Sequence, residues 1–252
     1  MPEDRNQAGE RVRDPAPTAT RYLDAIDELL VRARAANRES IPAAAAIVAT
    51  TVERGGIIQT FGSGHSQLLA LEAAGRAGGY AGVQVIFDPG MGRSELVEGY
   101  SQTLLRDLVL DPRDCLFVSS NSGRNPSPIE MAMAGRAAGL PVIAITALAY
   151  SKSSHSRHSS GRSLYELADV VLDTGGPPGD AALSIEGVPV AAGATSTVLG
   201  AALLNAVLVE SVAELVRRGV EPPLVRSYNL DGSEAHNERM FERYRGRVVT
   251  VI

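Results

Sequence analysis

The stretch "FVSSNSGRNPSPIE", residues 117–130, runs from apolar side chains through small polar ones and a glycine into a helical pattern. Serine and asparagine are common helix caps, so these residues fit an ordinary turn between a strand and a helix. They also fit a cradle for an anion, because hydroxyls donate hydrogen bonds and a helix N-terminus offers free N–H groups. The flanking sequence is needed to choose between the two interpretations.

Short apolar runs alternate with helical patterns on both sides of this stretch. The predicted strands are residues 57–62, 82–87, 114–120, 141–147 and 169–175, and the predicted helices are residues 20–37, 39–56, 66–79, 126–140 and 194–219. Apolar strands that alternate with helices are typical of a parallel sheet covered on both faces. We therefore predict an α/β fold, with a doubly wound parallel sheet, a helical pair before it and a long helix after it.

Length and composition favour one domain. The chain has 252 residues, 44% of them hydrophobic, which is enough for one large α/β domain or at most two small ones. We predict a single domain over residues 18–252, preceded by residues 1–17, which are polar, contain prolines and are expected to be disordered. The helix 194–219 is apolar on more than one face, so it is either a core helix or part of a subunit interface.

Composition and sequence pattern argue against nucleic acid and membranes as partners. The net charge is −5 and tryptophan is absent, so neither a broad cationic surface nor a stacking platform for nucleic acid is expected. The longest apolar run, residues 194–216, is interrupted by Asn205, Glu210 and Glu214, and the first residues are polar and charged. We expect a cytoplasmic protein with no membrane or nucleic-acid partner, in which the single cysteine, Cys115, belongs to the core.

Two polar loops follow predicted strands, where ligands bind in an open parallel sheet. The first is "FGSGHSQ", residues 61–67, and the second is the stretch quoted above. The chain has no G-x-x-x-x-G-K-[ST] segment, and Gln67 stands where the dinucleotide fingerprint requires its third glycine. We therefore expect no cofactor, and we predict that the two loops bind an anion.

At these residues the chain resembles a known family. "GSGHS" followed by "SSNSGRN" is similar to the paired phosphate loops of sugar isomerase (SIS) domains, over residues 57–173. The segments "YSKSSHSRHSSGRSLYELADVVLD", "PPGDA" and "NLDGSEAHNERM" resemble the UPF0309 subfamily of SIS proteins. The resemblance implies a flavodoxin-like sheet, a homodimer with sites near the subunit interface, and a phosphosugar ligand. It assigns phosphate contacts to Ser63, Ser66, Ser120, Ser122 and Asn125. Gly64, Asn121 and Gly123 are expected to contact the substrate as well.

Phosphosugar enzymes of this family remove the proton at C2 of the opened sugar, a step that needs a base and an acid. His65 lies in the first loop, and Glu72 lies on the helix after it, where it is either the base or a salt-bridge partner of Arg76. Glu39 is either a first-turn acid that balances the helix dipole or an active-site acid. By the resemblance, His236 is expected to enter a neighbouring subunit's site.

The serine-rich segment 151–163 and a Gly/Pro turn supply further candidates. Arg157 and His158 are predicted to donate hydrogen bonds from a loop that closes on the sugar. His155 and His158 are three residues apart, but neither acidic residues nor cysteines accompany them, so no metal site is predicted. Asp180 either binds sugar hydroxyls or serves only as an Asx-type turn residue.

The substituent at C2 would determine the reaction. A 2-hydroxyl allows an aldose–ketose isomerase, whereas a 2-acetamido group diverts the carbanion to expel the substituent at C3. We favour the second outcome, a lyase (dehydratase) acting on an N-acetylhexosamine 6-phosphate such as N-acetylglucosamine 6-phosphate. The alternatives are the isomerase and a non-catalytic sensor that binds a phosphosugar.

Overall fold

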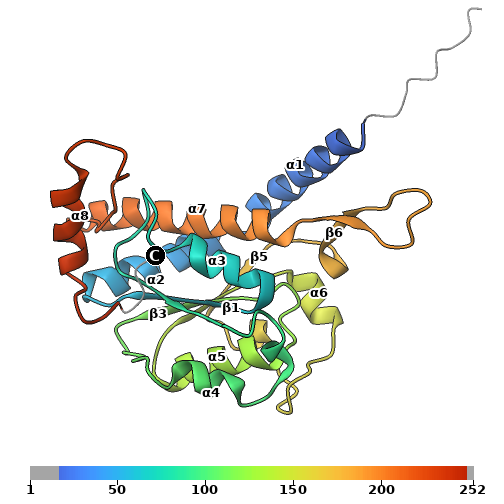
Figure 1. The fold of residues 1–252 in the computed structure, drawn as a ribbon, viewed down its shortest axis with the longest axis horizontal. Helices are drawn as coiled ribbons and strands as arrows, with labels where there is room; N and C mark the ends of the chain where they lie inside the picture. Colours follow the sequence, from blue (N-terminus) through green and yellow to red (C-terminus); the bar gives the residue numbers. More distant parts are fainter. Residues whose placement is uncertain (1–16, 249–252) are drawn as a thin grey trace, which may run out of the picture.

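The computed structural model describes residues 17–248, and its centre is a five-stranded parallel sheet (Figure 1). The strand order is β2-β1-β3-β4-β5, and every pair of neighbours is parallel. The strands are β1 (Ile58–Gly62), β2 (Val83–Ile86), β3 (Cys115–Ser119), β4 (Val142–Thr146) and β5 (Val170–Asp173). The predicted α/β fold is therefore confirmed, whereas the predicted disorder of residues 1–17 lies outside the described residues, apart from residue 17.

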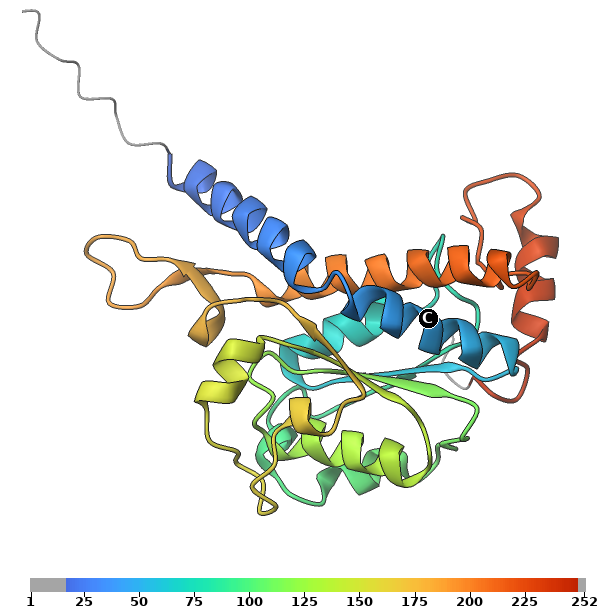
Figure 2. The same ribbon diagram turned by 180° about the vertical axis from the view of Figure 1, so that it is seen from behind.

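Helices cover both faces of the sheet (Figures 1 and 2). One face packs against α2 (Ser40–Glu53), α3 (Gln67–Glu72) and α7 (Ser196–Arg217), and the other packs against α4 (Tyr100–Leu105) and α5 (Pro126–Ala137). Residues of β1, β2, β3 and β4 are buried throughout because both faces of the sheet are covered, which explains their uninterrupted apolar runs. Cys115 is fully buried in the core between the sheet and the α2, α3 and α7 layer, as predicted.

Helix α7 is long and apolar enough to cross a membrane, by length and composition alone. In this fold, however, it packs along α2, and the side chains of Leu199, Leu203, Leu204 and Val207 are buried in the domain. The interpretation as a core helix is therefore the one that the structure supports. Val209 and Val216 remain exposed on its outer side.

Several elements lie outside the sheet and its two helical layers. Helix α1 (Thr18–Ala36) projects from the domain, and the hairpin β6 (Ala181–Leu183) and β7 (Ala192–Ala194) extends near it (Figure 2). Sequence analysis missed this hairpin, α4, α6 (Leu148–Ser153) and α8 (Ser233–Glu242), because each is short and lacks a long apolar period. The helix predicted over residues 66–79 ends at Glu72, since Gly75 and Gly78 adopt positive φ angles.

The reversal of strand order between β1 and β3 brings two loops together. Gly62 is the register partner of Ser119, so the loops that begin at Ser63 and Ser120 leave the sheet side by side. This is the topological switch point at which open α/β sheets bind their ligands.

The close turn after β1 gives a test of this arrangement. A Cβ atom added at Gly62 would overlap the backbone carbonyl of Ser66, so Gly62→Ala should lower the free energy of unfolding by about 1–3 kcal/mol. A Cβ at Gly200 would instead meet the end of the flexible Leu69 side chain, so Gly200→Ala is the matched control. Urea unfolding measures both variants, and equal stability of the two would contradict the crowding described at Gly62.

Candidate functional site

A cavity of about 470 Å³ lies between the two loops. It gathers residues from the turns after β1, β2 and β3 and from the N-terminus of α7. Its lining consists of Ser63, Gly64, His65, Ser66, Met91, Gly92, Arg93, Glu95, Ser120, Asn121, Ser122, Asn125, Tyr150, Gly179, Asp180 and Ser196. The structure thus brings together most of the residues predicted to bind substrate, and it places His65 with them.

The second loop is shaped to present hydrogen-bond donors. Gly123 has a φ of 60°, and a Cβ there would come within 2.6 Å of Ser151 Oγ, so this turn requires glycine. Ser120 Oγ accepts the N–H of Gly123 at 3.1 Å, which leaves the Ser120 proton free to donate. Asn125 stands at the N-cap of α5 but makes no side-chain capping bond. Pro126 and Pro128 have no N–H, so only Ser127 has one among the first three residues of this 12-residue helix.

The first loop is bound to a buried carboxylate. Ser63 Oγ donates to Asp88 Oδ2 at 2.9 Å, and Asp88 has no exposed surface. Asp88 also accepts hydrogen bonds from the Ser94 hydroxyl, the Tyr100 hydroxyl and the backbone N–H of Gly90. Asp88 follows β2, so the end of a third strand contributes to the site. Sequence analysis did not identify this residue.

Glu95 is a second acidic residue that sequence analysis missed. It belongs to a short 3-10 turn, Ser94–Leu96, and it lines the cavity. Burial raises the pKa of Glu95, and the charge of Asp88 adds to the rise, while a hydrogen bond with Asn125 and the charge of Arg157 oppose it. Its position after the predicted strand 82–87 was the available signal, because the carboxyl ends of parallel strands meet at one edge.

Three of the predicted catalytic residues do not reach the cavity of this chain. Glu72 forms an ion pair with Arg76 and accepts a hydrogen bond from Asn205 Nδ2 at 3.1 Å, which matches the salt-bridge alternative. Glu39 is exposed at the N-cap of α2. His236 lies on α8, where its Nε2 is 2.8 Å from the carbonyl oxygen of Leu224. Catalytic roles for these three residues therefore stay predictions that the geometry of one chain does not support.

Arg157 and His158, from the serine-rich segment 151–163, do not line the 470 Å³ cavity. Arg157 Nη1 donates to Asn125 Oδ1 at 3.1 Å, so it contacts a cavity residue without lining the cavity. His158 Nε2 is 3.8 Å from Glu130 Oε1, in a neighbouring cavity beside α4 and α5. Within residues 17–248, no group of three or more His, Cys, Asp or Glu side chains is placed to hold a metal ion.

Asp180 lines the cavity, but its carboxylate is already engaged. Its Oδ1 accepts the N–H groups of Thr195 and Ser196 and the Thr195 hydroxyl, and its Oδ2 accepts the Ser196 hydroxyl, all within 2.6–2.9 Å. Asp180 therefore occupies the N-terminus of α7, and its predicted contact with sugar hydroxyls would have to compete with these bonds. Gly123, in contrast, does not line the cavity, and its role is to shape the second loop.

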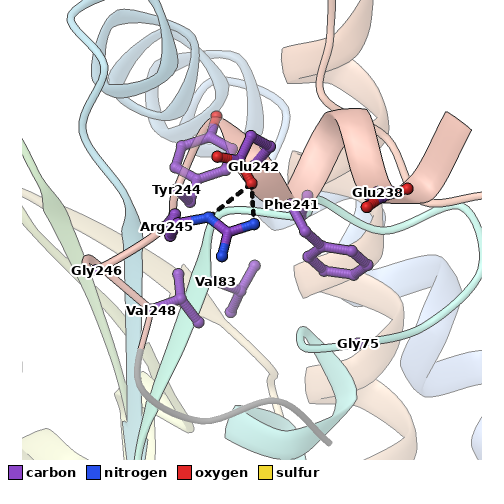
Figure 3. A pocket seen from close by; sticks show the side chains of 10 residues that line it. Gly75, Val83, Glu238, Phe241, Glu242, Tyr244, Arg245, Gly246 and Val248 are labelled. Carbon is purple, nitrogen blue, oxygen red and sulfur yellow. Dashed lines mark hydrogen bonds and ion pairs between the residues drawn. The ribbon is translucent and has the colours of Figure 1, made fainter. Parts of the chain in front are cut away.

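A separate cavity of about 280 Å³ lies between α8 and β2 (Figure 3). Phe241, Tyr244, Val248 and Val83 give it a mainly apolar wall, and the ion pair between Arg245 and Glu242 lies beside it. Val83 is the first residue of β2, so this cavity is at the amino end of the strands. That edge is opposite to the one at which ligands bind in such sheets.

Comparison with known proteins agrees with this architecture. A family model described as "SIS domain" matches residues 21–147. A UPF0309 protein of Geobacillus thermodenitrificans is 42% identical over 240 residues, which cover 92% of this chain and 96% of that protein. The chain belongs to the UPF0309 family of SIS-domain proteins.

Solved structures with the same fold include an enzyme and a ligand complex. Phosphoheptose isomerase GmhA of Neisseria gonorrhoeae superposes with a TM-score of 0.52 at 18% identity, over 78% of this chain and 97% of that one. The Vibrio vulnificus NanR protein, complexed with ManNAc-6P, superposes with a TM-score of 0.52 at 15% identity, over 93% of this chain and 71% of that one. At these identities the likeness establishes the SIS fold alone.

The raised pKa of Glu95 predicts a pH-dependent stability difference. A carboxyl whose pKa is higher in the folded protein is destabilising once pH exceeds its unfolded value, because folding then opposes ionisation. Glu95→Gln should therefore unfold at a higher urea concentration than the unchanged protein at pH 7, and this difference should narrow as pH falls towards about 4.5 and be absent below it. A difference that is constant between pH 7 and pH 4 would show that Glu95 titrates normally.

Proposed function

We propose that the cavity binds a sugar phosphate and that this UPF0309 protein removes the C2 proton of its ligand. The convergence of two polar loops and the partly buried carboxyl of Glu95 in one cavity at the switch point carries the proposal. Membership of the SIS family supports it. The named activity of GmhA and the ligand of NanR agree with it as well.

The phosphate belongs on the second loop in this proposal. Ser120 and Ser122 are on the cavity wall there, and the N-terminus of α5 adds the positive end of a dipole. Arg157 lies directly behind Asn125 and adds a positive charge on the same side. The first loop lacks these advantages, because α3 has only six residues and Asp88 lies behind Ser63.

Glu95 and His65 then face the sugar rather than the phosphate. A carboxyl with a raised pKa exchanges its proton closer to neutral pH, as a general base or acid requires. His65 is exposed on the opposite loop and can hold or deliver the second proton. These two side chains replace Glu72 as the proposed acid–base pair within one chain.

The favoured reaction is elimination from an N-acetylhexosamine 6-phosphate, and aldose–ketose isomerisation is the second candidate. The ManNAc-6P ligand of NanR supports an amino-sugar phosphate, and the activity of GmhA supports the isomerase. The similarity to NanR covers 93% of this chain, which also favours a phosphosugar sensor as a non-catalytic alternative.

A homodimer is part of the same proposal. Large apolar side chains are exposed on α1, at Leu23 and Val31, and on the outer side of α7, at Val209 and Val216. A second copy that covers these side chains would remove them from water. Such a dimer would also allow His236 to act in the partner's site.

Proton NMR in D₂O with N-acetylglucosamine 6-phosphate, and in parallel with glucose 6-phosphate, tests the function. Loss of the C2 proton together with a new vinylic signal would establish the lyase. Deuterium uptake with formation of a ketose would establish the isomerase. Binding of either ligand without exchange would identify a sensor, and the proposal fails if neither sugar phosphate binds.

The phosphate assignment gives a separate prediction. Ser122→Ala removes a hydroxyl donor to a charged ligand and should weaken binding of inorganic phosphate by roughly 1.5–3 kcal/mol. Isothermal titration calorimetry measures the change, and Ser159→Ala is a matched control, because Ser159 is outside the cavity lining. Unchanged phosphate affinity in Ser122→Ala would place the phosphate elsewhere.

A further inference from the structure

Asp88 is a buried carboxylate that the proposed reaction does not use. It has no exposed surface, and its two oxygens accept hydrogen bonds from three hydroxyls and one backbone N–H. Its own backbone N–H donates to Gln67 Oε1 at 2.5 Å, which ties it to the start of α3. Such a set of donors fixes the position of the carboxylate.

The bond to Asp88 determines what Ser63 can offer a ligand. A serine hydroxyl has one proton and two lone pairs. Because Ser63 gives its proton to Asp88 Oδ2 and lines the cavity, its hydroxyl has only lone pairs left for a ligand there and can act only as an acceptor. The oxygens of a phosphate dianion are acceptors too, so they would repel the Ser63 oxygen. A ligand hydroxyl or amide N–H would instead donate a hydrogen bond to it.

Charge acts in the same direction as this hydrogen bond. The negative charge of Asp88 is near enough to contribute to the raised pKa of Glu95 on the cavity wall. An anion placed beside Ser63 would meet the repulsion of Asp88, against which Arg93 on the same cavity wall supplies a positive charge. Ser120, by contrast, accepts a backbone N–H and keeps its own proton for a ligand. The two serine loops therefore differ in hydrogen-bond polarity although their sequences are alike.

We infer that Asp88 is a positioning residue that makes Ser63 a hydrogen-bond acceptor for a hydroxyl or amide N–H of the sugar, and not a phosphate ligand. This deepens the proposed function and rests on it, since it names the part of the ligand that the first loop recognises. It also replaces the expectation that Ser63 contacts the phosphate.

The test compares inorganic phosphate with N-acetylglucosamine 6-phosphate by isothermal titration calorimetry. Ser63→Ala should leave the affinity for inorganic phosphate within about twofold and weaken the sugar phosphate about threefold to tenfold, the loss of one neutral hydrogen bond. Ser122→Ala should weaken both ligands together. Circular dichroism checks that each variant is folded.

Asp88→Asn gives a sharper readout that a merely structural role would not produce. Gly90 and Tyr100 donate to Oδ1, so the amide NH₂ will stand at the Oδ2 position and donate to Ser63. The Ser63 proton then turns to the cavity, so phosphate should bind at least as tightly as before while the sugar phosphate binds more weakly. Tyr100→Phe, which removes a different donor from Asp88, is the control. It should change neither the affinity for inorganic phosphate nor the affinity for the sugar phosphate.

The outcomes distinguish an error in the role given to Asp88 from an error in the proposed function. If the unchanged protein binds both probes but Ser63→Ala or Asp88→Asn weakens inorganic phosphate as much as Ser122→Ala does, the inference is wrong and the proposed function stands. If the unchanged protein binds neither probe, the proposed function fails and the inference fails with it. If Asp88→Asn does not fold, Ser63→Ala still decides the question.

Discussion

The parallel pairing of β1 with β3 is the constraint on which the site depends. Because Gly62 and Ser119 are register partners at the point where strand order reverses, the two following loops start as neighbours and must diverge around a space. Shifting this register would separate Ser63 from Ser120 and remove the cavity between them. The helices that cover the two faces of the sheet serve this arrangement, since they keep the central strands buried.

Most of the fold was predictable because its signals are local. Each buried strand is a short apolar run, and each long helix has an apolar period, so residues 57–62, 114–120 and 194–219 were assigned almost correctly. The end of α3 was missed because glycine is tolerated in a helical pattern, and only the positive φ angles of Gly75 and Gly78 show that the helix has stopped. The hairpin and α8 lack a sustained period and give no comparable signal.

The site was only partly predictable, for a physical reason. Serine and glycine after a strand are visible in sequence, so both loops were found. Asp88 and Glu95 were missed because they follow β2 without any motif, and their importance arises from burial and from contacts with residues distant in sequence. Glu72 was favoured by its distance from the first loop, yet which side of α3 it occupies depends on the packing against α7, which places it beside Asn205.

Asp180 has a consequence for the electric field inside the cavity. The longer helices that begin at its wall are α5 and α7, and each would direct the positive end of its dipole inward. The carboxylate of Asp180 already occupies the start of α7, with hydrogen bonds to the first residues there, and so acts as a built-in counter-anion. Of these two helix starts, only that of α5 has no carboxylate at its first residues, so its dipole is the one left uncompensated at the wall. The proposed phosphate position lies on that side, and the proposed ligand would therefore have one preferred orientation.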